Sequence, residues 1–443
     1  MGTTLTDASF GRQLRHAHFL FRPGYVPLNQ GSYGAYPRQV QDVLRAVQDE
    51  VQQDPDGFVR YVYPERLNAI RTLVADFLHA DVDEIVLVAN ATTGLNAVLR
   101  NMTFHQGEKI AHVQGIYGAI EKTIDYLVET TAVESVCVPF DAAVDTDDVL
   151  LDAFRSVLKE NHGSIKVAVF DTVMSMPGLR MPFERLTKLC REFGVLSVID
   201  GAHGIGLVEL DLKTLNADFL VTNCHKWLFV PHTCSVLYVA SRNQHLMRSS
   251  LPTSHGFQPA PHILQRKKYI SPYEPPTSVN PFVFQFEYCG TIDNAPTLCI
   301  PAALDFRQGI CGGEKMILEY CKNLAREGEI RAAEILESSP LYIPESKRTA
   351  FANVQLPIPF QSEDCPARTD AIPLSDLSTV LRFILNSLKK DYNTFVNVAF
   401  FSGYLWARFS AQVYLEAADF DHGALALKDI CRRVISREYI HFS

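Results

Sequence analysis

The sequence predicts an α/β protein in which a large domain with a mostly parallel sheet precedes a smaller α+β C-terminal domain. From about residue 83 to residue 239, short apolar segments alternate with helical patterns. These segments lack regular polar alternation, which is typical of parallel strands covered by helices on both faces. A chain of 443 residues also exceeds one ordinary hydrophobic core, so at least two domains are expected.

The order of elements gives the predicted domain layout. Strands are expected at 85–89, 109–113, 134–138, 165–170, 195–199, 219–222 and 235–239, with helices at 92–101, 120–129, 147–160 and 315–336. Residues 251–285 interrupt this pattern with seven prolines, and long irregular segments are more often functional than idle. We therefore predict an N-terminal segment that contributes to the active site (1–40), a large α/β domain (41–285) and a small α+β domain (286–443).

The composition argues against nucleic acid and membrane as partners. Net charge is −9, and 47% of the residues are hydrophobic while 21% are charged, as in ordinary globular proteins. No segment is long enough to span a bilayer, and the first residues lack a secretory pattern. The ten cysteines include no CxxC pair, which predicts free thiols in a reducing compartment. We expect a cytoplasmic enzyme without a metal site.

Lys226 is the most informative residue, because it lies in the apolar segment VTNCHKWLFVPHTCSVLYVA (221–240). A buried ammonium needs a partner, so a salt bridge or a covalent role is expected. Asp200 follows the strand predicted at 195–199, and the carboxyl ends of parallel strands face the ligand crevice. A lysine that forms an imine and a carboxylate opposite a pyridine nitrogen are the two groups that pyridoxal phosphate (PLP) needs most.

Two further segments fit the same cofactor. Thr92, Thr93 and Gly94 follow a strand and open a helix, where backbone N–H groups and hydroxyls bind anions such as phosphate. The alternative is a plain helix cap at Thr92. Tyr117 follows another strand and could stack on the cofactor ring and transfer a proton, or be an ordinary loop tyrosine.

Taken together, these motifs resemble those of fold-type-I PLP enzymes of the class V aminotransferase superfamily. More narrowly, the chain is similar to the branch of isopenicillin N epimerase-like proteins, hercynylcysteine sulfoxide lyases and the loline-biosynthesis PLP enzyme. The motifs that carry the resemblance are LNQGSYGAYP (28–37), NATTG (90–94), IYGA (116–119), SMPG (175–178), DGAHGIG (200–206), NCHKW (223–227), LPTSHGF (251–257), GTIDN (290–294) and WARFSAQVYLE (406–416).

The resemblance implies a role for each matching residue. It makes Lys226 the Schiff-base lysine, Asp200 the partner of the pyridine nitrogen and Arg408 the group that binds the substrate carboxylate. It also implies a homodimer with shared active sites. The cofactor-binding residues that it implies are Thr92, Thr93 and His225 near the phosphate, Tyr117 on the ring, His203 near the phenolic oxygen, Ser175 facing the cofactor, and Thr291 from a second subunit. Gln30 and Ser32 are expected on the substrate side.

Two departures from the sulfoxide lyases lie near the expected substrate. Gln30 and Tyr33 stand where those lyases have histidine and phenylalanine, and residues 393–407 contain no basic side chain. We expect an enzyme that forms a Cα carbanion from an amino-acid-type substrate, with a loline-type Mannich cyclisation in specialised metabolism as the leading outcome. The alternatives are a C–S lyase acting by β-elimination, an epimerase or aminotransferase, and a non-catalytic PLP-fold scaffold.

Overall fold

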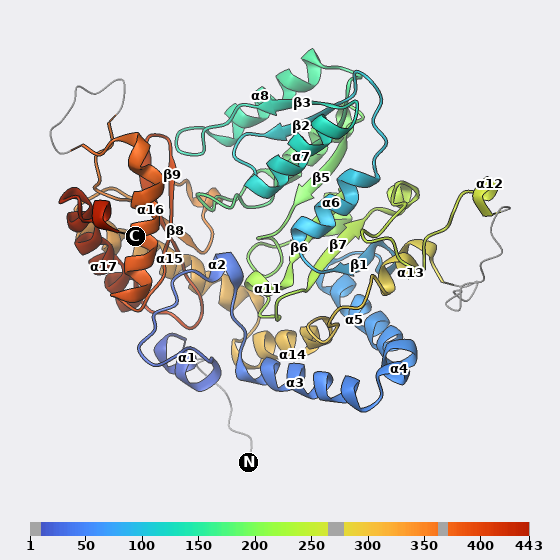
Figure 1. Cartoon of the computed structure of the whole chain (residues 1–443), viewed down its shortest axis with the longest axis horizontal. Helices are drawn as coiled ribbons and strands as arrows, with labels where there is room; N and C mark the ends of the chain where they lie inside the picture. Colours follow the sequence, from blue (N-terminus) through green and yellow to red (C-terminus); the bar gives the residue numbers. More distant parts are fainter. Residues whose placement is uncertain (1–9, 265–278, 362–370, 443) are drawn as a thin grey trace.

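The computed structural model describes residues 10–264, 279–361 and 371–442 (Figure 1). The irregular segment predicted at 251–285 falls partly outside this set, since residues 265–278 are not described. Its described part holds two short helices, α12 (Pro261–Leu264) and α13 (Pro281–Glu287).

The large sheet has seven strands in the order β1-β7-β6-β5-β4-β2-β3. Only β7 runs antiparallel, pairing with β1 on one side and β6 on the other, so the mostly parallel sheet is confirmed. Its strands are β1 (Ile85–Val88), β2 (Lys109–Val113), β3 (Glu134–Val138), β4 (Ile165–Asp171), β5 (Leu196–Asp200), β6 (Phe219–Asn223) and β7 (Ser235–Val239). The predicted strands at 165–170 and 195–199 thus extend to end on aspartates.

Helices follow the strands because apolar residues recur on one face of each. The helix predicted at 147–160 is confirmed as α8, and its leucines and Phe154 are buried against the sheet. The helices of this part are α4 (Pro55–Gly57), α5 (Tyr63–Leu78), α6 (Ala91–Asn101), α7 (Gly118–Thr130), α8 (Asp147–Glu160), α9 (Phe183–Glu192), α10 (Leu212–Leu215), α11 (Cys224–Trp227) and α14 (Ile300–Asp305).

A second, three-stranded antiparallel sheet lies to the left of the large one in Figure 1, in the order β8-β10-β9. It consists of β8 (Phe351–Gln355), β9 (Asn397–Phe401) and β10 (Tyr404–Ser410), with helices α15 (Glu314–Leu336), α16 (Leu377–Lys390) and α17 (Ala417–Ile435). This is the smaller α+β part that the sequence predicts. The division of the chain at residues 40 and 285 stays a prediction.

The N-terminal segment joins the two sheets. It contains α1 (Arg12–His18), α2 (Gln30–Tyr33) and α3 (Arg38–Gln53). The backbone N–H of Ser410 on β10 donates to Leu28 O at 2.8 Å, while α2 contacts α11 beside the large sheet. The segment therefore lies between the two parts of the fold, where a site shared by both sheets would form. Among the described helices, none is long and apolar enough to cross a membrane.

Candidate active site

Lys226 stands on α11, the single helical turn that follows the buried strand β6. Asn223 ends the strand and holds this turn: its Oδ1 accepts from the backbone N–H of Ala91 at 2.9 Å and from Ser235 Oγ at 2.6 Å. One amide oxygen thus ties together the start of α6, the end of β6 and the start of β7. The lysine is presented from a rigid point at the edge of the large sheet, half-buried and next to the start of α6.

The contacts of His203 bear on the protonation of Lys226. The indole Nε1–H of Trp227 donates to His203 Nδ1 at 3.0 Å, and since an indole only donates, Nδ1 must accept. The neutral ring then carries its hydrogen on Nε2, which lies 3.2 Å from Lys226 Nζ. This Nε2–H requires an acceptor, so the arrangement favours the neutral lysine amine. In the same direction, burial lowers the pKa of Lys226 to about 8, although the Asp200 carboxylate opposes this shift.

Two carboxylates lie side by side below the lysine. Asp171 and Asp200 end neighbouring parallel strands in direct register, and each is 4% exposed. Asp200 Oδ1 accepts from the backbone N–H of Ala202 at 2.9 Å. Burial raises the pKa of both groups, and that of Asp171 rises well above its ordinary value because Asp200 also repels its charge. The repulsion between these neighbouring carboxylates therefore favours one negative charge on the pair over two, and the upward pKa shift is the stronger one at Asp171.

The N-terminus of α6 places two threonines at the positive end of a helix dipole. The structure corrects the predicted cap: Asn90, not Thr92, accepts from the backbone N–H of Thr93 at 2.8 Å. Thr92 and Thr93 lie in the first turn of the helix and not in the preceding loop; Thr92 is exposed and Thr93 half-buried. Their side chains are thus available at the positive end of the helix dipole, as a phosphate site requires.

Arg408 reaches the site from the central strand of the small sheet. It is 2% exposed, and its guanidinium lies over the Phe351 ring at 4.4 Å. Nη1 donates to the carbonyl oxygen of Ser175, and Nη2 donates to Ser32 Oγ at 3.3 Å. Burial lowers the pKa of Arg408 to about 10, so the group stays charged. Three residues predicted from separate motifs therefore meet at one place.

Gln30 is engaged with the protein at both ends of its amide. Nε2 donates to the backbone oxygen of Lys226 at 2.6 Å, and Oε1 accepts from the Tyr414 hydroxyl at 2.6 Å. A little further on, an added Cβ at Gly34 would lie 1.7 Å from the His225 carbonyl oxygen, so only glycine fits there. The N-terminal segment therefore holds the backbone of the lysine turn, and the predicted contact of Gln30 with substrate stays a prediction.

Three other predicted residues lie at the margins of this arrangement. Tyr117 precedes α7 and is 47% exposed. The His225 ring lies with Nδ1 3.4 Å from the Cys234 carbonyl oxygen, and burial lowers its pKa to about 4. Thr291 is exposed, with its hydroxyl 3.0 Å from the Tyr288 hydroxyl. The roles of all three toward a cofactor stay predictions.

The sequence reasoning missed four residues of this site. Asp171 ends a strand just as Asp200 does, so the same signal would have found it. Trp227 is quoted in the lysine motif, but its hydrogen bond to His203 leaves no sequence pattern. Phe351 and Asn353 come from β8 and reach Arg408 only through the antiparallel register of the small sheet.

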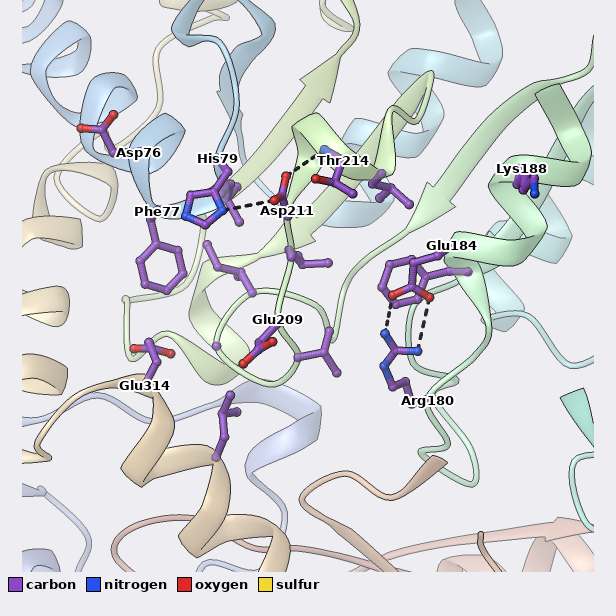
Figure 2. Close-up of a pocket in the computed structure, with 18 of the residues that line it drawn as sticks. Asp76, Phe77, His79, Arg180, Glu184, Lys188, Glu209, Asp211, Thr214 and Glu314 are labelled. Atoms are coloured by element: carbon purple, nitrogen blue, oxygen red, sulfur yellow. Dashed lines mark hydrogen bonds and ion pairs between the residues drawn. The ribbon is translucent and has the colours of Figure 1, made fainter. Parts of the chain in front are cut away.

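A large cavity lies away from Lys226. It measures about 950 Å³ and is formed by the end of α5, the loop between β5 and β6, α9 and the start of α15 (Figure 2). Four of its labelled ionisable groups pair with one another: His79 lies 3.5 Å from Asp211, and Arg180 pairs with Glu184. Lys226 does not line this cavity, so cavity size does not identify the reaction centre.

The residues around Lys226 suit PLP. The neutral amine supplies the group that condenses with the aldehyde, the ionised Asp200 suits a protonated pyridine nitrogen, and the end of α6 suits a phosphate. Arg408 adds a buried cation for a carboxylate. With a mostly parallel seven-stranded sheet beside a small α+β part, these features define a fold-type-I PLP enzyme.

Comparison with known proteins identifies the family. The aminotransferase class-V family profile matches residues 61–265. The L-cysteine desulfhydrase-like protein lolT2 of Epichloe uncinata is 36% identical, covering 97% of this chain and 95% of that protein. Hercynylcysteine sulfoxide lyase of Schizosaccharomyces pombe is 30% identical, covering 95% of this chain and 98% of the lyase. The chain belongs to the class-V aminotransferase family and uses PLP.

A solved structure shares the fold. The cystine C–S lyase C-DES, in complex with its reaction product cysteine persulfide, superposes with a TM-score of 0.72 at 17% identity, covering 92% of this chain and 98% of that chain. Sequence identity at this level says nothing about the substrate. The similarity of the two structures agrees with the fold class that the sequence predicts.

Proposed function

We propose that this enzyme removes the Cα proton of an amino-acid-type substrate, with Lys226 as the base and Arg408 as the carboxylate anchor. The observation that carries the proposal is the hydrogen-bond pattern Trp227–His203–Lys226, which favours an unprotonated amine. A base must be unprotonated before it acts. When bound, PLP supplies the electron-withdrawing ring that stabilises the negative charge left on Cα.

The surrounding residues have distinct tasks in this scheme. Asp200 holds a proton on the ring nitrogen, which keeps the ring electron-withdrawing. Gln30 keeps the backbone of Lys226 in place through its 2.6 Å hydrogen bond. Tyr117 and Ser175 are proposed to contact the ring, and Thr92, Thr93 and His225 the phosphate.

The leading outcome that we propose is a Mannich-type ring closure in specialised metabolism. In this step the electron pair on Cα forms a carbon–carbon bond to the carbon of an iminium within the substrate, and the iminium nitrogen takes up the displaced π electrons. The Cα proton stays with Lys226 until it is lost to solvent. Support comes from the similarity to lolT2 over nearly the whole chain and from the altered substrate-side residues Gln30 and Tyr33.

The second candidate is a C–S lyase. Here the same electron pair expels a sulfur leaving group from Cβ, so that the C–S bond breaks and sulfur departs with both electrons. The names of lolT2 and of the similar S. pombe lyase both refer to such cleavage. Epimerisation and transamination rank below it, and a non-catalytic scaffold is disfavoured because Lys226 is present.

Deuterium exchange tests the shared step without choosing between outcomes. Holoenzyme in D₂O is expected to exchange the Cα hydrogen of at least one amino acid in a panel, as followed by mass spectrometry. Borohydride should fix the cofactor on Lys226, and Lys226→Ala should abolish both the fixation and the exchange. Fixation on a different lysine would overturn the site assignment.

Product analysis then separates the two outcomes. Elimination from L-cysteine or an S-alkylcysteine sulfoxide releases pyruvate and ammonia, whereas ring closure keeps every substrate carbon in one product. Pyruvate formed at the rate of Cα exchange would make the enzyme a lyase and remove the cyclisation. If Cα exchange occurs and no sulfur substrate yields pyruvate, the result would favour ring closure.

The proposed assembly is a homodimer. Thr291 is exposed and belongs to the GTIDN motif, whose resemblance implies a phosphate contact with the cofactor of a second subunit. Each active site would then be completed by its partner chain.

A further inference from the structure

The inner face of the small sheet carries a buried amide that no protein group satisfies. Asn353 on β8 is 0% exposed, and neither Oδ1 nor Nδ2 has a hydrogen-bond partner among the described residues. Arg408 Nε is in the same condition. Leaving such groups unpaired costs about 1–3 kcal/mol each, so a buried orphan in a folded protein calls for an explanation.

The register of the sheet places these atoms next to one another. Asn353 is the direct antiparallel partner of Arg408. Its backbone N–H donates to Glu329 Oε1 at 3.1 Å, and its carbonyl oxygen accepts from Leu341 at 2.9 Å, so both point away from β10. The pair is therefore of the non-hydrogen-bonded type, in which side chains on the same face lie closest, with Cβ atoms about 4.5–5.5 Å apart.

The same face looks onto the reaction centre. Phe351, two residues before Asn353 and on the same side of the strand, lies with its ring 5.4 Å from His203 and 5.2 Å from Trp227. Arg408, opposite Asn353, covers that ring. The unpaired amide of Asn353 thus lies on the sheet face that looks toward the lysine turn. Its neighbour on that face, two residues away, is Phe351, whose ring contacts His203 and Trp227.

The positive charge of the Arg408 guanidinium favours binding of an anion beside it. Arg408 is buried, and within the described residues no carboxylate pairs with it; its two contacts are a carbonyl oxygen and a hydroxyl. The carboxylates of Asp200 and Asp171 act on Lys226, but neither forms an ion pair with Arg408 among the described residues. A carboxylate accepts up to about four hydrogen bonds through its two oxygens, which exceeds the number that one guanidinium fork donates to it.

We propose that Asn353 is a second carboxylate-binding residue, which donates from Nδ2 to the carboxylate held by Arg408. This rests on the proposed function of Arg408 as carboxylate anchor. The substrate class that follows is α-amino acids with a free carboxylate, in preference to the corresponding amines. A bound carboxylate would thereby supply an acceptor for Asn353 Nδ2, a donor that has no partner among the described residues.

The test uses two probes that differ only in the carboxylate, L-serine and ethanolamine. Their dissociation constants are measured on holoenzyme from the absorbance change of the bound cofactor. In Asn353→Leu, which keeps the volume and removes the amide, L-serine should bind about tenfold more weakly and ethanolamine within twofold of the parent. Asn353→Asp keeps the shape but places a competing carboxylate beside Arg408, so L-serine should weaken by more than tenfold.

Asn397 supplies a matched control. It is the other cross-strand partner of Arg408, but its amide lies 3.9 Å from the sulfur of Met176 and it is only half-buried. Asn397→Leu should therefore leave both constants unchanged. Equal weakening of both probes in Asn353→Leu would show a structural effect and overturn the inference, as would unchanged L-serine binding.

Different results would remove the proposed function and the role of Asn353. If borohydride does not fix the cofactor on Lys226, the proposed function fails. If fixation on Lys226 persists while Asn353→Leu and Asn353→Asp bind L-serine like the parent, only the role of Asn353 is removed. Should Asn353→Leu not fold, Asn353→Asp still decides, because it changes no more than one group.

Discussion

The two ends of the site differ in how their buried polar groups are satisfied. At the large sheet, Asn223, His203 and Asp200 each have protein partners at 2.6–3.2 Å. At the small sheet, Asn353 and Arg408 keep three polar atoms without a partner in the described chain. The cofactor end is rigidly prearranged by the protein, whereas the carboxylate end is completed by what binds there.

This difference teaches where specificity is expected. A fully satisfied network tolerates little change, because removing one partner leaves a buried group unpaired. The unpaired groups of Asn353 and Arg408 are instead stabilised only by a ligand that supplies the missing acceptor, so this end of the site discriminates among ligands. Substitutions at the first end should change chemistry or cofactor state, and substitutions at the second should change substrate affinity. The predictions below test that division.

The largest effect is expected at Asp200. Asp200→Asn keeps the size of the side chain but cannot hold a proton on the ring nitrogen, so Cα exchange should slow by about 100-fold or more. Cofactor content should stay near one per chain, because the phosphate contacts at α6 are untouched. Absorbance and exchange rates measured on the same sample check both parts. Undiminished exchange would remove Asp200 from its role.

At the opposite end, Arg408→Ala should raise the dissociation constant of L-serine by about 10–100-fold, since hydrogen bonds to charged groups contribute about 1.5–3 kcal/mol each. Ethanolamine binding and cofactor content should not change. Arg408→Lys should rescue part of the loss, because a single ammonium cannot reproduce the two parallel bonds of a guanidinium. An Arg408→Ala enzyme with normal L-serine affinity would mean that the carboxylate is held elsewhere.

Thr291 tests whether the cofactor end is complete within one chain. If its hydroxyl binds the phosphate in a partner subunit, Thr291→Val should retain PLP about tenfold less well, the value of one charge-assisted hydrogen bond. Dialysis followed by absorbance measures retention, and light scattering measures assembly. An active monomer saturated with PLP would contradict the shared site.

The smallest effect is expected at Trp227. Trp227→Phe removes the N–H that holds His203 in one tautomer, so His203 Nε2 becomes able to accept from a Lys226 ammonium. The ammonium is thereby stabilised, and the pKa of Lys226 should rise from about 8 by up to about one unit, since one unit corresponds to about 1.4 kcal/mol.

The pH dependence of acetylation of Lys226 in cofactor-free protein, followed by peptide mass spectrometry, measures this shift. Labelling should rise with pH, with its midpoint higher in Trp227→Phe than in the parent. The other tryptophan of the chain, Trp406, is buried but has no bond to His203, so Trp406→Phe should leave the midpoint where it was. Identical midpoints in all three proteins would rule out tautomer control.

The comparison also explains what the sequence could predict. Lys226 and Asp200 follow apolar strands, and strand ends of a parallel sheet converge at one edge, so their meeting was predictable. The seven strands were found because their apolar runs are separated by helices. Asp171 follows its predicted strand just as Asp200 does, so the same signal could have found it.

Asn353 could not have been found in this way. It meets Arg408 through a register between β8 and β10, strands separated by a long stretch of chain, and register depends on packing across the whole sheet. The tautomer of His203 is equally invisible, because it is set by one indole N–H and not by any spacing of residues. Local patterns therefore revealed the cofactor end, and tertiary structure was needed for the substrate end.

The position of the N-terminal segment has a consequence for how the enzyme matures during synthesis. Gly31 N–H donates to Ser410 Oγ at 3.2 Å and Gln30 contacts Tyr414, while Gly34 lies against the lysine turn. The first helices must therefore wait for β10, which leaves the ribosome last among the strands. A nascent chain that has already emerged through Lys226 possesses its reactive amine but lacks the strand that anchors substrate. Amino acids in the cell would thus meet a competent catalyst only once β10 has emerged and joined the fold.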